Sequence, residues 1–403
     1  MRPSGPRITY GGWGLASGIS LARARCTAPR RRLGYPAPVD EVHLAEQLIA
    51  IDTSERTGVD HAVEFVAGWL EGRCVPVREL RFADRRCVLA RVGEGPRRIL
   101  LNGHLDVVPG LPDQFVPVRR GTRLYGRGAY DMKAAVAAMM LAVSELQRDG
   151  VDGVQVELLV VPDEERTEPG ENCSEMIVRD GLRADFVICG EPTDLHVGVQ
   201  AKGVAMLELR VPGVAAHGST PWLGRNAILR GLDLFRRIER LPFMSERTDL
   251  FPGPSVNLGR IAGGDVLNRV PDCCRLYVDV RCLPGQDMDE VVGQIRALDP
   301  EVAVEVLVAR PPADLSPHNP YVRDLLVEAR AQEPSAAAVG RDGSSDAVAF
   351  LEVGVPAVEY GPVGAGHHGP REWVEMASLA RYRRSLVRFA RRVGAGSPSV
   401  AAV

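Results

Sequence analysis

Apolar residues recur along the chain in two patterns, one typical of strands and one typical of helices. From about residue 41 onward the two patterns alternate. Short apolar runs predict strands at 98–102, 154–161, 186–189 and 357–360. Wider spacing predicts helices at 41–51, 61–71 and 131–148. Strands that alternate with helices indicate a fold of the α/β class, in which a mainly parallel sheet carries helices on both faces.

The stretch 197–310 interrupts this alternation. Its pattern predicts strands at 205–211, 256–261, 274–281 and 303–308, and helices at 226–241 and 288–298. The resulting order, βαββαβ, is the ferredoxin-like plan, so we expect a second domain inserted into the first. The catalytic domain then comprises 37–196 and 311–395, with tails at 1–36 and 396–403.

Residues 1–36 differ in composition from the rest of the chain. They hold seven arginines and many Gly and Pro, and no acidic residue precedes Asp40. We expect a disordered basic tail, because this composition cannot build a packed element. Ile8 to Ala22 faintly resembles a signal peptide, but its glycines and the arginines that follow argue against export.

Composition narrows the possible classes of protein. The 403 residues are 45% hydrophobic and 25% charged, with a formal net charge of −3, which favours a globular protein that binds neither nucleic acid nor an anionic membrane. The longest strongly apolar run, Ala134 to Val143, is too short to span a bilayer. Eight scattered cysteines without a CxxC pair predict reduced thiols in the cytoplasm. Lys133 and Lys202 are the only lysines.

Five potential metal ligands follow predicted strand ends or lie in nearby loops: His104, Asp131, Glu165, Glu191 and His368. Ligands bind beyond the carboxyl ends of parallel strands. Imidazole and carboxylate groups suit a divalent transition metal, with zinc the leading candidate and cobalt possible. Two dications would be neutralised by three carboxylates and one bridging hydroxide, so we expect two ions.

Two further acidic residues adjoin these ligands. Glu164 stands beside Glu165 and is free to take a proton from water as a general base. Asp106 follows His104 by two residues, and on an extended segment both side chains share a face. We therefore expect Asp106 to orient the imidazole through its second nitrogen.

Four strings of residues, taken together, resemble one known family: Gly-His-Leu-Asp-Val-Val-Pro at 103–109, Gly-Arg-Gly-Ala-Tyr-Asp-Met-Lys at 126–133, Asp-Glu-Glu at 163–165 and Gly-Glu-Pro-Thr at 190–193. They are similar to the acetylornithine deacetylase and succinyl-diaminopimelate desuccinylase family of two-metal amidohydrolases, which also contains carboxypeptidases and dipeptidases. The resemblance runs from about residue 40 to 395.

This resemblance implies a role for each ligand. Asp131 would bridge the two ions, His104 and Glu191 would complete one site, and Glu165 and His368 the other. Glu164 would be the general base that activates a metal-bridging water. His368 is preferred over His367 because the family places a glutamate four residues after the ligand, here Glu372.

The inserted domain resembles the family's dimerisation lid in the segments 202–203, 213–221 and 226–228. The resemblance implies a homodimer in which His217 donates a hydrogen bond to the oxyanion. Asn268 and Arg281 match positions that hold the substrate carboxylate, and 343–347, with Ser345, resembles a substrate loop. From the residues alone, His217 could be a turn histidine, Arg281 a solvated strand residue, and Ser345 and Asp346 caps of the next helix.

The expected function is removal of an N-acyl group from an amino acid, a small-molecule substrate. A dipeptidase or carboxypeptidase of the same family is the main alternative. A metal- or amino-acid-binding protein without activity would not need Glu164 and all five ligands intact. An amide-forming enzyme that runs the same site in reverse is a third class, which product analysis would separate.

Overall fold

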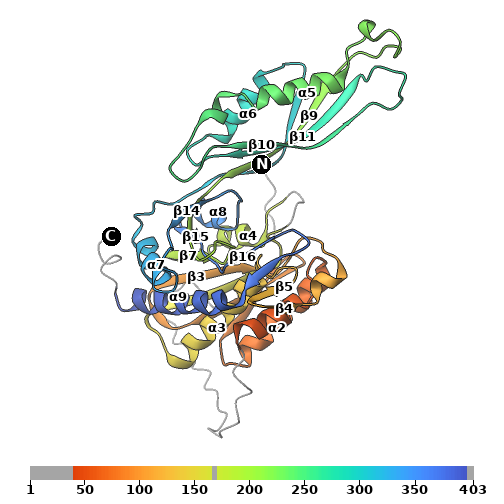
Figure 1. The fold of residues 1–403 in the computed structure, drawn as a ribbon. Coiled ribbons are helices and arrows are strands. Elements are labelled where there is room, and N and C mark those ends of the chain that lie inside the picture. Colours follow the sequence, from red (N-terminus) through yellow and green to blue (C-terminus); the bar gives the residue numbers. More distant parts are fainter. Residues whose placement is uncertain (1–39, 166–169, 397–403) are drawn as a thin grey trace. The chain divides into compact units, whose positions relative to one another are not determined.

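The computed structural model of the chain describes residues 40–165 and 170–396 (Figure 1). The tail expected at 1–36 lies outside these residues, and so does 397–403. The α-helices are α1 (Glu41–Ile49), α2 (Arg56–Glu71), α3 (Lys133–Asp149), α4 (Cys173–Arg179), α5 (Ala227–Ile238), α6 (Met288–Ala297), α7 (Pro320–Arg330), α8 (Ala347–Leu351) and α9 (Met376–Gly394).

The largest sheet has nine strands, in the order β1-β2-β6-β3-β7-β15-β8-β13, with β14 also paired to β8. These strands are β1 (Val77–Phe82), β2 (Arg85–Val92), β3 (Glu94–His104), β6 (Asp152–Val161), β7 (Phe186–Cys189), β8 (Val197–Ala201), β13 (Ala313–Asp314), β14 (Ala338–Arg341) and β15 (Ala357–Glu359). The central strands β6, β3, β7 and β15 run parallel, as the sequence predicts. All four residues of β7 are buried, which is typical of a parallel strand covered on both faces.

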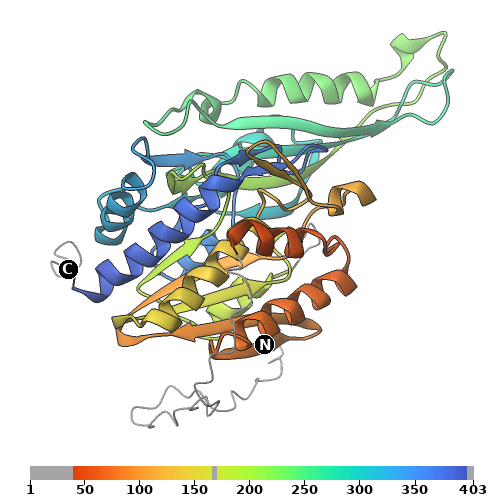
Figure 2. The same cartoon turned by 60° about the horizontal axis from the view of Figure 1, so that its bottom comes forward.

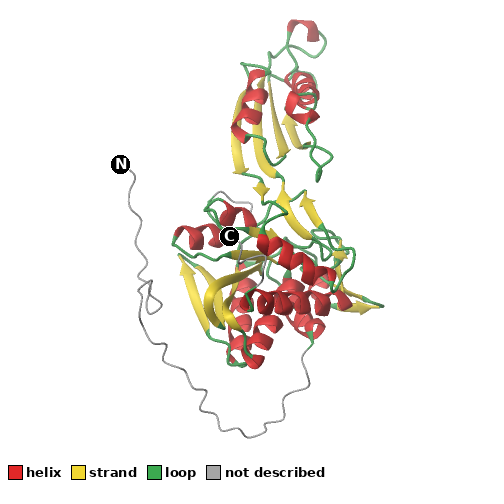
Figure 3. Cartoon of the chain, turned by 90° about the vertical axis from the view of Figure 1, so that its left-hand side faces the viewer, coloured by secondary structure: helices red, strands yellow, loops and turns green. Residues whose placement is uncertain are grey.

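Helices cover both faces of this sheet. One layer contains α1, α2, α3, α7 and α9 (Figures 2 and 3). These helices bury Leu44, Val63, Met139, Leu325 and Leu386 in a common core. On the other face, α4 and α8 pack side chains such as Ile177 and Phe350 against Leu100 and Leu159 of the sheet. None of the helices in the described residues is long and apolar enough to cross a membrane.

Residues 203–310 form a second, four-stranded sheet with its own core. Its strands are β9 (Gly203–Pro212), β10 (Ser255–Gly263), β11 (Cys273–Cys282) and β12 (Ala303–Arg310). They are antiparallel and follow the order β10-β11-β9-β12. Alternate residues such as Leu209 and Leu276 pack with Ile238 and Val291 of the two helices α5 and α6. The opposite face of the sheet, which we call the open face, carries residues such as Arg275, Asp279 and Arg281.

A small antiparallel sheet, not predicted from the sequence, has the order β16-β17-β5-β4. Its strands are β4 (Val118–Arg120), β5 (Arg123–Tyr125), β16 (Gly364–Ala365) and β17 (Trp373–Glu375). Tyr125 pairs with Trp373, so this sheet joins two segments that are far apart in the sequence. They are the two segments that carry Asp131 and His368.

Several element boundaries differ from the predicted ones. Helix α3 begins at Lys133 and not at Asp131, because 126–132 forms a loop that is held by hydrogen bonds described below. Helix α5 ends at Ile238 and not at Leu241. Leu241 precedes Pro242, and a residue before proline disfavours helical backbone.

Candidate active site

Adjacent parallel strands deliver three of the five candidate ligands to one edge of the sheet. His104 is the last residue of β3, Glu165 follows the end of β6, and Glu191 follows the end of β7. Strand β3 lies between β6 and β7 and pairs with both. The carboxyl ends of the three strands therefore meet, as the sequence predicts.

The small sheet brings in the remaining two candidates. Asp131 lies in the loop after β5, and His368 lies in the loop before β17. Because β5 and β17 pair with each other, the two loops start from neighbouring points. Sequence reasoning identifies both residues but not the strands that bring them together.

Asp131 stands between the two imidazoles. Its Oδ1 lies 3.2 Å from Nε2 of His104, and its Oδ2 lies 3.5 Å from Nε2 of His368. Nε2 of His104 is also 3.9 Å from Oε1 of Glu191, and Nε2 of His368 is 2.8 Å from Oε1 of Glu165. The site thus consists of two imidazole–carboxylate pairs that share Asp131. His367 instead packs its ring near Tyr130, with ring centres 5.8 Å apart.

This arrangement fits a divalent cation. Ligand atoms of His104, Asp131 and Glu165 all lie within 4.8 Å of one another. They are nitrogen and oxygen donors without a thiolate, the set preferred by zinc and similar ions at catalytic sites. The structure therefore contains a possible metal-binding site.

Electrostatics explain why the site would take up cations. Burial raises the pKa of Glu191, and the nearby carboxylate of Asp131 raises it further. Burial also raises the pKa of Glu164 well above its ordinary value. Partial burial would raise the pKa of Asp131, but hydrogen bonds with His104 and His368 outweigh this effect and lower it. Hydrogen bonds with Asp131 and Glu165 raise the pKa of His368 to about 10. Crowded carboxylates of this kind hold protons when no other cation balances them.

Asp106 contacts the site differently from the prediction. Nδ1 of His104 is 2.9 Å from the backbone carbonyl oxygen of Asp106 and 3.5 Å from its carboxylate. The carboxylate accepts hydrogen bonds from the backbone N–H of Glu164, at 3.1 Å, and of Glu165, at 2.8 Å. Asp106 therefore braces the backbone that presents the two glutamates, while its carbonyl faces the imidazole.

Glu372 is a buried residue whose contacts the sequence did not suggest. Its carboxylate accepts hydrogen bonds from the backbone N–H of Gly128, Tyr130 and Asp131, at 2.9–3.0 Å, and from Nη1 of Arg127, at 2.9 Å. One side chain thus holds the loop that carries Asp131. From the sequence, Glu372 indicated only that His368 is preferred over His367 as the ligand.

The two lysines are both buried anchors. Nζ of Lys133 donates to the backbone oxygen of Ile51 at 2.7 Å, and burial lowers its pKa to about 7. Nζ of Lys202 lies 2.8 Å from a carboxylate oxygen of Asp342. Lys202 thus ties the start of β9 to the loop after β14.

His217 and Asn268, the candidates for the oxyanion and the substrate carboxylate, lie together at the surface. Both are exposed, and Gly218, beside His217, donates its N–H to the carbonyl of Asn268 at 2.7 Å. Nδ1 of His217 lies 2.7 Å from the hydroxyl of Ser219. Within 40–165 and 170–396, neither side chain forms a hydrogen bond or ion pair with the five candidate ligands.

Arg281 and Ser345, the other two substrate candidates, already have protein partners. Arg281 pairs with Asp279 through two contacts of 2.8 and 3.1 Å. Ser345 donates to Glu359 at 2.7 Å and accepts from the N–H of Ala347, at the start of α8, at 3.3 Å. Ser345 thus contributes to the cap of α8, whereas the carboxylate of Asp346 makes no cap.

Comparisons with known proteins identify the family of the chain. The profile of peptidase family M20/M25/M40 matches residues 100–392, and the chain belongs to that family. It is therefore a metal-dependent hydrolase that acts on amide bonds.

Two curated relatives illustrate the likeness within the family. The chain is 32% identical over 281 residues to an acetylornithine deacetylase of Photorhabdus laumondii, covering 64% of this chain and 72% of the relative. It is 29% identical over 386 residues to a succinyl-diaminopimelate desuccinylase of Sphingopyxis alaskensis, covering 87% and 98%.

Solved structures share the fold. An M20 family metallo-carboxypeptidase of Sulfolobus solfataricus superposes with a TM-score of 0.75 at 18% identity, covering 89% of this chain and all of that one. Human carnosine dipeptidase 1 superposes with a TM-score of 0.69 at 16% identity, covering 88% and 96%.

Proposed function

We propose that this enzyme removes an N-acyl group from an amino acid, with two divalent metal ions held by His104, Asp131, Glu165, Glu191 and His368. Zinc is the leading candidate for both ions, and cobalt is the second. The observation that carries the proposal is the position of Asp131 between two imidazole–carboxylate pairs. The curated acetylornithine deacetylases and the succinyl-diaminopimelate desuccinylase among its relatives support the substrate class.

Glu164 would perform the proton transfers. Bound metal ions supply Lewis acidity for the substrate carbonyl and for the attacking water. Glu164 accepts the proton of that water and then passes it to the nitrogen of the leaving amine. The hydrogen bonds from the N–H of Glu164 and Glu165 to Asp106 hold the backbone in place while this proton moves. His217 would donate a hydrogen bond to the oxyanion.

We further propose that 197–310 is a ferredoxin-like lid and dimerisation domain inserted between 37–196 and 311–395. Its strand order and the exposure of His217 support this view. His217 would serve the active site of the partner chain in a homodimer, and Asn268 and Arg281 would hold the substrate carboxylate. The tail at 1–36 and a cytoplasmic location remain predictions.

A dipeptidase or carboxypeptidase is the alternative. Both reactions cleave an amide bond, and both need a recognised carboxylate. Arg281 and its neighbours on the open face could serve the carboxylate of an N-acyl amino acid or of a peptide. The chemistry at Glu164 is the same in both cases, so only the substrate separates them.

A substrate panel tests the proposal. Protein treated with a strong chelator is assayed with N-acetyl amino acids, N-succinyl amino acids and dipeptides, before and after addition of zinc or cobalt. We expect no hydrolysis without metal and preferential hydrolysis of N-acyl amino acids with it. Faster hydrolysis of dipeptides would favour the alternative, and full activity in metal-free protein would contradict the metal assignment.

A further inference from the structure

The carboxylate of Asp194 contacts two segments that carry candidate metal ligands. Its Oδ1 accepts a hydrogen bond from the hydroxyl of Tyr130 at 2.8 Å and a second one from the backbone N–H of Gly364 at 3.0 Å. Tyr130 immediately precedes Asp131, and Gly364 lies in the segment that leads to His368. One oxygen atom therefore joins the loop of Asp131 to the loop of His368.

Asp194 also belongs to the segment of a third candidate ligand, since it closely follows Glu191. The N–H of Asp194 donates to the carbonyl of Pro362 at 3.2 Å, and the N–H of Leu195 donates to the carbonyl of Gly361 at 2.9 Å. The side chain of Leu195 is buried in the main core. These contacts fix the backbone from which the carboxylate of Asp194 reaches its two donors.

The backbone at Asp194 and Leu195 is strained. The φ angles of these residues are 56° and 65°, in the left-handed region that favours glycine. Such a conformation costs free energy at other residues and persists only where the surrounding contacts hold it. Strain of this kind gathers at functional sites, and here it occurs where the segment of Glu191 meets the other two ligand segments.

Tyr130 is held through its side chain as well as through its backbone. It is 5% exposed, and a buried tyrosine hydroxyl needs a hydrogen-bond partner, which is Asp194. Its N–H donates to Glu372. A Cβ added at Gly364 would lie 2.5 Å from Cδ2 of Tyr130, so the ring packs directly against the backbone of β16. The loop of Asp131 therefore has two carboxylate supports.

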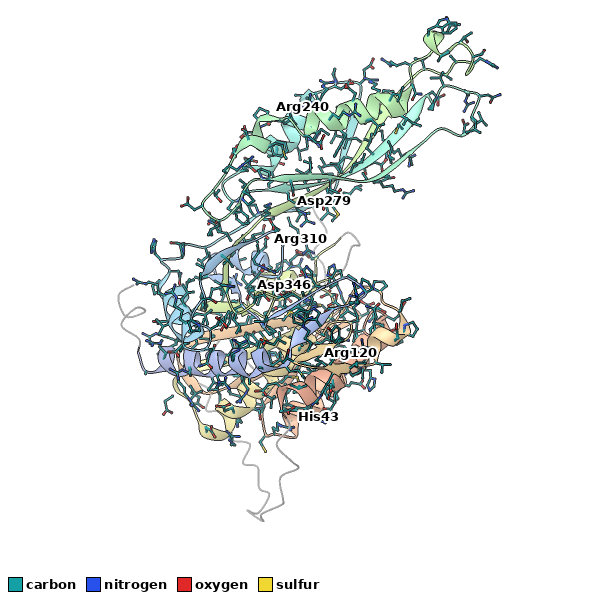
Figure 4. All side chains as sticks on the ribbon, viewed as in Figure 1. His43, Arg120, Arg240, Asp279, Arg310 and Asp346 are labelled. Carbon is teal, nitrogen blue, oxygen red and sulfur yellow. The ribbon has the colours of Figure 1, made fainter. Side chains whose placement is uncertain are left out.

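Gly364 begins a strand that the small sheet holds weakly. β16 is one edge strand of that sheet and pairs with β17 over two residues, and the other edge strand, β4, ends at Arg120 (Figure 4). Strand pairing this short gives little stability on its own. The hydrogen bond from Gly364 to Asp194 adds a connection outside the sheet. We therefore expect the position of β16, and of His368 after it, to depend on Asp194.

The distance that this connection controls is one that a metal ion requires. Oδ2 of Asp131 and Nε2 of His368 are 3.5 Å apart. Two donors that each lie about 2.1 Å from a tetrahedral zinc ion stand about 3.4 Å from each other. Asp194 is itself exposed, so water screens its charge, and its effect on the ion is exerted through geometry.

We propose that Asp194 is a positioning residue that, through Tyr130 and Gly364, sets the spacing between Asp131 and His368 and thereby the affinity for the ion between them. This inference rests on the proposed function, because it assumes that both ligands bind the same ion. Metal affinity depends on the groups that orient the ligands, and loss of such a group typically weakens binding about 10–100-fold.

The test measures the zinc affinity of the full chain after chelation, by competition with a chromophoric chelator. Asp194→Ala removes the acceptor of both hydrogen bonds, so zinc should bind about 10–100-fold more weakly. Tyr130→Phe removes one of the two, and a loss of about three- to tenfold is expected. Asp314→Ala is the matched control, because Asp314 is also exposed and accepts a side-chain hydrogen bond at 2.8 Å, from Gln200. It should bind zinc as wild type does.

Three further readouts separate positioning from a general loss of stability. Adding Tyr130→Phe to Asp194→Ala should weaken zinc binding by less than about twofold more, because both changes break the same hydrogen bond. Asp194→Asn keeps an acceptor oxygen and should stay within about threefold of wild type. At saturating zinc, kcat and KM of Asp194→Ala should return to the wild-type values for the substrate that wild type prefers.

Unchanged zinc affinity in Asp194→Ala would overturn the proposal, and so would additive losses in the double variant. A fall in kcat that saturating zinc does not restore would assign Asp194 to the reaction itself and would also overturn it. If metal-free Asp194→Ala melts at a lower temperature than metal-free wild type, the loss of affinity is required of Tyr130→Phe, which leaves the contact with Gly364 in place. Failure of the proposed function would look different, because wild type would then bind no zinc or hydrolyse no N-acyl amino acid.

Discussion

The region of the five candidate metal ligands and the surface around His217 and Asn268 are organised in opposite ways. Around Asp131, buried groups hold each part in place: Glu372 accepts four hydrogen bonds, and Asp106 accepts two. His217 and Asn268 are exposed, and within the described residues the ring of His217 forms hydrogen bonds with nearby Ser219 alone. The first region is prearranged by buried hydrogen bonds, whereas the proposed roles of His217 and Asn268 require a substrate or another chain to reach them.

The strongest test of the prearranged region is Glu164→Gln. The amide has nearly the same size as the carboxylate but cannot accept the proton, so kcat should fall about 10²–10⁴-fold. Metal content, measured by elemental analysis, should stay at the wild-type value. Glu171→Gln, at an exposed glutamate nearby, is the control and should be fully active. A loss of bound metal in Glu164→Gln would make Glu164 a ligand and not the base.

The exposed region is tested by His217→Ala, which should lower kcat about 10²–10³-fold if the imidazole stabilises the oxyanion. Co-expression with Glu164→Ala then asks which chain His217 serves. Random pairing makes half of the dimers mixed, each with one complete site of two, so about a quarter of wild-type activity should return. If activity stays at the level of the single variants, His217 serves its own chain and the two regions are completed within one molecule.

A smaller effect is expected from Glu372→Gln. This substitution changes the hydrogen bonds that hold the loop of Asp131, and it changes none of the candidate ligands. The amide can accept fewer of the four hydrogen bonds and brings N–H donors toward N–H groups, so metal affinity should weaken about 10–100-fold. Metal titration of the chelated protein measures this. Glu375→Gln, whose side chain pairs with Arg381 at 2.6 Å, is the control. Unchanged metal affinity in Glu372→Gln would show that the loop of Asp131 keeps its conformation without the full set of hydrogen bonds to the Glu372 carboxylate.

The sequence predicted the parts of the site that depend on long, regular elements. Strand β3 ends at His104, Glu164 and Glu165 follow the end of β6, and Glu191 follows the end of β7. The common edge of these strands therefore follows from the apolar pattern. The small sheet could not be predicted in this way, because strands of two or three residues have no measurable periodicity. The contacts of Glu372 depend on that sheet and were missed with it.

Other features were missed because they depend on pairing between distant segments. Arg281 and Arg310 lie on either side of Val204 because of the register of β11 and β12 on β9, which a single sequence does not reveal. The preference of His104 for the carbonyl of Asp106 over its carboxylate depends on local backbone geometry, although the two residues were correctly placed side by side.

The pairing of β5 with β17 also has a consequence for when the site can form during synthesis. Asp131 and His368 are separated by more than half of the chain, and β5 and β17, which join their loops, lie before and after residues 203–310. A ribosome adds about 5–20 residues per second, so many seconds pass between the synthesis of Asp131 and that of His368. Until the segment at 364–375 emerges, the nascent chain can offer His104 and Glu191 but not His368. The candidate ligands are therefore complete only near the end of translation, after residues 203–310 have been synthesised.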